Sequence, residues 1–125
     1  MKNGSLNIPM IVIDSKNSRI RIHRSTLHLL GNPEYIQLLV NPERLTLAIL
    51  PSQKLKTANE IRWDRIAESK SCELYSKILI RQLGSICPNW KSNGKYRLYG
   101  VCASDGLLIQ FDMSSAEEVG KEVMI

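Results

Sequence analysis

The sequence predicts a β-rich α+β protein, a small barrel or sandwich built from two β-α-β-β repeats. Three observations predict it: short apolar or alternating segments, turn residues between them, and two short Leu- and Ile-rich segments that follow strands and are typical of helices. The chain has 125 residues, of which 43% are hydrophobic and 23% charged, and this is enough to bury a core. We therefore expect residues 1–125 to form a single compact domain.

Seven segments are typical of strands, because apolar residues alternate with polar ones or run together between turn residues. They are residues 8–14, 19–23, 34–40, 44–50, 72–76, 95–102 and 107–113. The turn "NPE" separates the third from the fourth, and the Asp-Gly turn "ASDG" separates the last two. Both pairs therefore predict hairpins.

Two short helices are predicted, one after each of two strands. In "RSTLHLLG", Ser25 or Thr26 is the expected N-cap and Gly31 the residue just after the end. In "KILIRQLG", Gly84 is expected to end the second helix in the same way. Within the connector 52–71, residues 57–70 are ambiguous, because the capping box of Thr57 and Glu60 favours a helix whereas "EIRW" suits a strand. The acidic tail 114–125 predicts either a short terminal helix or a frayed end.

The second half of the chain repeats the order of the first. Placing Gly31 on Gly84, an offset of 53 residues, aligns strand, short helix, glycine, loop, strand, hairpin and strand. We interpret residues 19–51 as one repeat and residues 72–113 as a second, divergent repeat. One unit of this size buries little surface alone, so two units are expected to cover one another.

The stretch "RIRIHRSTLHLLGNPEYIQLLVNPERLTLAIL" resembles the swapped-hairpin unit of the SpoVT/AbrB and MazE group of bacterial DNA-binding regulators. The shared pattern is a basic and apolar strand, a short Leu-rich helix, a loop into an alternating strand, a turn and an apolar last strand. The resemblance covers residues 19–50 and, more loosely, 72–113. The same core is also similar to small proteins of Gram-positive bacteria. Where the family usually has a proline that opens the helix, this chain has His23 or Arg24, and "NPE" replaces the usual Gly-Asp loop.

The resemblance implies a barrel of two interlocked units, from two chains or from tandem copies in one chain. It also implies that basic residues around the first strand and the helix contact DNA. The positions that match are Arg19, Arg21 and Arg24 in the first unit and Lys77 and Arg81 in the second.

Charge and spacing support a polyanionic partner independently. The net charge is +5, and 16 of the 17 Lys and Arg residues lie in residues 1–100, whereas the last 25 residues are acidic. In the strand 19–23, Arg19, Arg21 and His23 share one face at spacings of about 7 Å, which suits a row of phosphates or base edges. The alternative is a solvated face that protects an edge strand from aggregation.

One aromatic residue is a candidate for contact with a base. Trp90 lies in the loop "CPNWKSNGK", which the first repeat lacks, and is flanked by Lys91 and Lys95. The other aromatic residues sit in apolar strand patterns and are expected to pack in the core or on strand faces. Lys91 therefore joins the predicted nucleic-acid contacts.

Other classes of function have little support in the sequence. His23 and His28 lack further ligands at metal-site spacing, and no phosphate-binding loop, dinucleotide fingerprint or nucleophile elbow occurs. We expect no enzyme activity, cofactor, metal or small-molecule ligand. The three cysteines without a CxxC pair, and the lack of a signal peptide or apolar run of about 20 residues, predict a cytoplasmic protein that does not enter a membrane.

The leading hypothesis is a small DNA-binding regulator of transcription that docks a basic strand face on phosphates. The rival is a protein-interaction or antitoxin-like adaptor module that binds no nucleic acid. It would use exposed strand edges and the acidic tail to bind a protein partner or a second copy of the chain.

Overall fold

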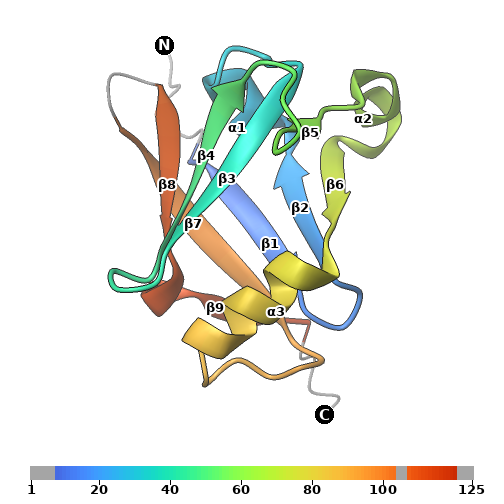
Figure 1. Cartoon of the computed structure of the whole chain (residues 1–125). Coiled ribbons are helices and arrows are strands. Elements are labelled where there is room, and N and C mark those ends of the chain that lie inside the picture. The colour runs from blue at the N-terminus through green and yellow to red at the C-terminus, as the bar shows by residue number, and fades with distance from the viewer. Residues whose placement is uncertain (1–7, 104–106, 121–125) are drawn as a thin grey trace.

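The computed structural model describes residues 8–103 and 107–120, which form a nine-stranded antiparallel sheet that curls into a nearly closed barrel (Figure 1). The strands are β1 (Met10–Asp14), β2 (Arg19–His23), β3 (Tyr35–Asn41), β4 (Thr46–Ser52), β5 (Asn59–Glu60), β6 (Ser71–Tyr75), β7 (Lys95–Ala103), β8 (Leu108–Asp112) and β9 (Glu117–Val119). The helices are α1 (Arg24–Leu29), α2 (Trp63–Ser69), α3 (Lys77–Ile86) and the one-turn 3₁₀ helix η3 (Met113–Ser115). The predicted β-rich barrel is confirmed at this level.

The strands follow one another around the barrel in the order β5-β3-β4-β8-β7-β1-β2-β6, and β9 adds to β7. Both predicted hairpins, β3–β4 and β7–β8, are confirmed. Within the described residues no backbone pairing joins β5 to β6, so the barrel is open there, and α2 lies beside the opening (Figure 1). α1 lies at one end of the barrel and α3 lies across the other.

Alternation along the strands fills the interior. In β2, for example, Ile20 and Ile22 are buried while Arg21 and His23 are exposed, which is the predicted pattern. The fully buried side chains of the other strands come from both halves of the chain and meet in one core: Ile11, Ile13, Ile36, Leu47, Ile49, Leu98, Ile109 and Phe111. No helix in the described part of the chain is long and apolar enough to cross a membrane.

The predicted N-cap of the first helix is wrong. α1 begins at Arg24, and its cap is His23, whose Nδ1 accepts a hydrogen bond from the Ser25 backbone N–H at 3.1 Å. Thr26 does not cap the helix, because it is buried against β1. Its hydroxyl accepts a hydrogen bond from the Met10 backbone N–H and donates one to the Met10 C=O, both at 3.1 Å. Gly31 follows the helix end with φ +84°, as predicted.

The second helix does not end at Gly84. α3 continues to Ile86, with Ser76 as its N-cap, and the backbone N–H of Cys87 still bonds to the carbonyl of Leu83. The helix continues because Leu83 is buried and Ile86 packs against the core, so another turn adds apolar contacts. The two glycines aligned by the repeat therefore differ in structure.

The connector and the tail contain more regular structure than expected. Residues 57–70 hold both a two-residue strand, β5, and a helix, α2. The predicted capping box at Thr57 and Glu60 is wrong, because α2 begins only at Trp63 and its N-cap, Arg62, makes no side-chain capping hydrogen bond. In the tail, Asp112 rather than Ser114 or Ser115 caps η3, and β9 pairs with β7 in place of a terminal helix. The predicted Asp-Gly turn, residues 105–106, and residues 121–125 lie outside the described residues.

Candidate nucleic-acid interface

The predicted basic residues separate into two groups along the barrel. β2 begins near α3, because the carbonyl of Ser18 accepts a hydrogen bond from the backbone N–H of Ser76 at the α3 N-cap. β2 ends at His23, where α1 begins at the opposite end of the barrel. The first group runs from one end of the barrel to the other and consists of Arg19, Arg21, His23 and Arg24. The second group lies at the α3 end and consists of Lys77, Arg81 and Lys91.

The two arginines of β2 are held by carboxylates. Arg19 Nη2 lies 2.8 Å from Asp14 Oδ2, and Arg19 Nη1 lies 3.1 Å from Glu73 Oε2. Arg21 donates to the same Glu73 oxygen from Nε at 3.1 Å and from Nη2 at 2.8 Å. Glu73 reaches both because β6 pairs with β2 and places Glu73 directly opposite Arg21. This row of cations is therefore largely neutralised within the protein.

The pKa values of these carboxyl groups follow from the same contacts. Burial disfavours the charged form of Asp14, but hydrogen bonds from Asn17 and Arg19 outweigh it, so the pKa of Asp14 lies below its usual value. The hydrogen bond from Arg21, with the nearby charge of Arg19, also lowers the pKa of Glu73. Both groups are therefore carboxylates at neutral pH, and both have cationic partners.

His23 and Arg24 form the far end of this row. His23 uses its ring nitrogen to cap α1, which gives this histidine a structural role. Arg24 donates its backbone N–H to the Lys70 carbonyl, and no carboxylate of the described residues lies within 4.0 Å of its guanidinium. Arg24 stands apart from the α3 end by the length of β2, about 15 Å.

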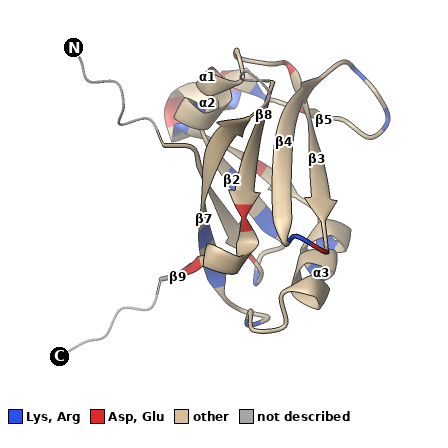
Figure 2. Ribbon diagram, turned by 90° about the vertical axis from the view of Figure 1, so that its left-hand side faces the viewer, with Lys and Arg blue, Asp and Glu red and all other residues tan. Residues whose placement is uncertain are grey.

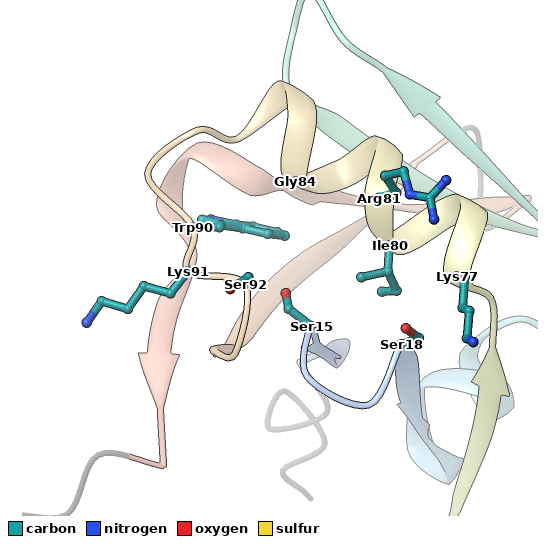
Figure 3. A pocket seen from close by; sticks show the side chains of 9 residues that line it. All are labelled: Ser15, Ser18, Lys77, Ile80, Arg81, Gly84, Trp90, Lys91 and Ser92. Atoms are coloured by element: carbon teal, nitrogen blue, oxygen red, sulfur yellow. The ribbon is translucent and has the colours of Figure 1, made fainter.

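The second group surrounds a cavity of about 390 Å³, which we call the α3 pocket (Figure 3). One wall is a face of α3 made by Lys77, Ile80, Arg81 and Gly84, whose i, i+3, i+4, i+7 spacing places them in one stripe. Ile80 is 8% exposed and provides the apolar part of this wall. Gly84 carries no side chain, and an added Cβ would meet no atom within 4 Å.

The other walls come from two loops. The β1–β2 turn provides Ser15 and Ser18, and the α3–β7 loop provides Trp90, Lys91 and Ser92. The backbone N–H of Ser15 donates to the carbonyl of Gly94 at 2.9 Å, which joins the two loops. The Ser18–Ser76 backbone hydrogen bond, also 2.9 Å, joins the turn to α3. All three walls are therefore linked by the backbone.

Trp90 is fixed by its neighbour on β7. Its ring stacks on Tyr96 with centroids 4.6 Å apart and planes 7° apart, and the Tyr96 hydroxyl accepts a hydrogen bond from the Lys91 N–H at 2.5 Å. Gly94 is required here, because a Cβ at this position would lie 2.7 Å from the Tyr96 hydroxyl oxygen. Since Tyr96 covers one face of the indole, the part that lines the pocket is the rest of the ring.

The α3 pocket is cationic. None of its nine lining residues is acidic. Within the described ranges no carboxylate lies within 4.0 Å of Lys77 or Arg81, while Lys91 pairs with Glu118 at 3.5 Å. The sequence pointed to Lys77, Arg81, Lys91 and Trp90, but it missed Ile80, Gly84, Ser15, Ser18 and Ser92. The helical spacing of Ile80 and Gly84 with Lys77 was a usable signal, whereas the serines come from a distant turn.

In the described part of the chain, no three His, Cys, Asp or Glu side chains come close enough to hold a metal ion. Cys72, Cys87 and Cys102 are all free, and burial, with the nearby charge of Glu73, raises the pKa of the Cys72 thiol to about 11. Burial also raises the pKa of Cys87. Both buried thiols therefore stay protonated near neutral pH.

A different surface, the outer face of β3, β4, β8 and β7, carries no charge across its middle (Figure 2). The strand registers place Leu39 beside Ala48, Ala48 beside Gln110, and Gln110 beside Val101. Leu39 is 53% exposed and Val101 is 65% exposed. We call this row and its neighbour Tyr99 the outer apolar face; exposed apolar surface of this kind is typical of interaction sites.

Comparisons of the chain with protein-family models, with curated proteins and with solved structures give no significant match.

Proposed function

We propose that the protein binds nucleic acid, DNA in the first instance, through the cationic α3 end of the barrel. The observation that carries the proposal is the pair Lys77 and Arg81 on one face of α3, beside a pocket with no acidic lining residue. Lys77 and Arg81 have no carboxylate partner in the described ranges, so both can exchange their counterions for phosphates. The sequence placed the main phosphate contacts on the face of β2, whereas this proposal places them on the face of α3.

We further propose that the barrel consists of two interlocked units of the AbrB-like swapped-hairpin kind, used to regulate transcription. Strand pairing supports this. β2 pairs with β6 and β4 pairs with β8, which are matching strands of the two predicted repeats. β1, which precedes the first unit, pairs with β7 of the second unit. In the same way β5, which precedes the second unit, pairs with β3 of the first unit. The free cysteines agree with a cytoplasmic location.

The test is a salt titration of duplex DNA binding by the wild type and by Lys77→Gln/Arg81→Gln. Loss of two phosphate contacts should weaken binding roughly tenfold or more and should lower the slope of log K against log salt by about two. Arg21→Gln should change the affinity by less than about threefold, because Arg21 already pairs with Glu73.

The matched control is Lys54→Gln/Lys56→Gln, which removes the same charge from the exposed β4–β5 loop, away from α3. This variant should keep most of the affinity and the slope. The proposal fails if the wild type has no measurable affinity at about 50 mM salt, or if both double variants lose affinity equally.

A second function, protein interaction, is favoured by the outer apolar face. Val101 and Leu39 are exposed on a sheet whose middle lacks charge, which suits a protein partner or a second copy. Val101→Glu/Leu39→Glu should turn any self-associated wild type into monomers in sedimentation equilibrium. If the wild type is monomeric at every concentration, the outer apolar face does not bind a second copy of the chain.

A further inference from the structure

The α3 pocket combines two kinds of surface that nucleotides require together. Trp90 and Ile80 give an aromatic and an apolar wall, and Gly84 leaves the space beside them open. Lys77 and Arg81 carry positive charge on the α3 wall, and three serines add hydroxyl groups. The Lys91 side chain points away from the cavity (Figure 3) and pairs with Glu118. Purely electrostatic docking on a duplex needs only the charges, so the apolar walls call for another explanation.

The pocket has the size of a small-ligand site. Its volume of about 390 Å³ lies in the range typical of pockets that enclose one small molecule. A double helix is far too wide to enter such a cavity, and a paired base is covered by its neighbours in the stack. One unpaired nucleotide meets neither obstacle.

Contacts within the protein hold the walls of the pocket in place. The Ser15–Gly94 and Ser18–Ser76 backbone hydrogen bonds hold the turn against the loop and the helix. Tyr96 holds the indole of Trp90 by stacking. Little side-chain or loop ordering is then needed on binding, which favours affinity.

We propose that the α3 pocket binds a single unpaired nucleotide. The base lies against Trp90 and Ile80, in the space that Gly84 leaves open. The phosphate lies at Lys77 and Arg81, one helical turn apart on α3. The inference rests on the proposed function for these two phosphate contacts, and adds that a single strand is preferred over a duplex. The same chemistry occurs in a strand of nucleic acid and in a free mononucleotide.

The test uses the two tryptophans. Trp63 lies next to His28, at the α1 end, so the Trp63→Phe protein reports on Trp90 alone. The probes are an oligothymidylate of about ten nucleotides, a duplex of the same length, and thymidine monophosphate. We expect the single strand to quench Trp90 fluorescence and to bind at least about tenfold more tightly than the duplex. Equal quenching by the monophosphate would assign a free nucleotide as the ligand.

A second variant blocks the space without changing charge. Gly84→Leu fills the wall beside Trp90 and should weaken single-strand binding about fivefold or more, the value of one base–aromatic stack. Gln82→Leu is the matched control, because Gln82 is exposed on α3 but does not line the pocket. Thermal unfolding of both variants shows whether the fold is kept, and Trp90→Leu, which removes the aromatic ring, gives an independent loss of stacking.

The possible failures are distinguishable. If duplex and single strand bind equally, without quenching and without an effect of Gly84→Leu, the nucleotide pocket is wrong. The proposed function then still stands when Lys77→Gln/Arg81→Gln weakens duplex binding. If none of the probes binds, both proposals are wrong.

Discussion

The β2 face and the α3 pocket carry similar positive charge but differ in what their neighbours carry. Across from Arg21 lies Glu73 on β6, and beside Arg19 lies the buried Asp14. Around Lys77 and Arg81 the other lining residues are serines, Ile80, Gly84, Trp90 and one further cation, Lys91. A cation is therefore available to a ligand only where the fold brings no carboxylate to it.

The largest expected effect is on stability at the β2 face. Asp14→Asn leaves the partly buried Arg19 guanidinium with one carboxylate, Glu73, and removes the charge that holds Asn17. We expect a loss of about 2–4 kcal/mol in the free energy of unfolding, measured by urea denaturation. Lys77→Gln, which breaks no ion pair, should change it by about 0.5 kcal/mol or less. Equal losses would show that the two regions do not differ in this way.

The difference should also appear as a dependence of stability on pH. The pKa values of Asp14 and Glu73 are lower in the folded protein than their ordinary values of 3.8 and 4.5. Their stabilisation is therefore complete above those ordinary values and is lost as the pH falls through the folded pKa values. The free energy of unfolding should fall below about pH 4.5, and less steeply in Asp14→Asn. An unchanged slope in that variant would contradict the assignment.

A smaller effect is expected on DNA binding when Arg21 on β2 loses its carboxylate partner. Glu73→Gln removes the partner of Arg21, which is 46% exposed and can then reach a phosphate. We expect duplex affinity to rise about threefold and the salt slope to steepen by about one. Filter binding or fluorescence anisotropy at several salt concentrations measures both. Unchanged binding would mean that the β2 face lies away from the nucleic acid.

The sequence was informative where structure is local. The alternation of Ile20 and Ile22 with Arg21 predicted both the strand and its outward face, because a strand fixes these directions from residue to residue. It could not show that Arg19 is bound by Glu73, since the two are 54 residues apart and meet only through the β2–β6 pairing. The same holds for the pocket: the stripe on α3 is local, but Ser15 and Ser18 reach it through tertiary structure.

Gly84 shows the remaining difficulty. A glycine after an apolar helical segment predicts a helix end, and Gly31 meets that expectation with φ +84°. Gly84 has the same local sequence signal but is followed by Ile86, which packs against the core and extends the helix. Packing of the next turn decided between the two outcomes, and such packing is not visible in a short window of sequence.

The smallest effect separates these two glycines and tests the open space in the α3 pocket. Gly84→Ala replaces a helix-interior glycine where an added Cβ meets nothing within 4 Å, so it should stabilise the protein by about 0.5–1 kcal/mol. Gly31→Ala should destabilise it by about 1 kcal/mol, because alanine disfavours the positive φ. Urea denaturation of the two variants should therefore give shifts of opposite sign. A loss of stability in Gly84→Ala would mean that the space beside Trp90 is filled in solution, and the pocket would then be too small for a base.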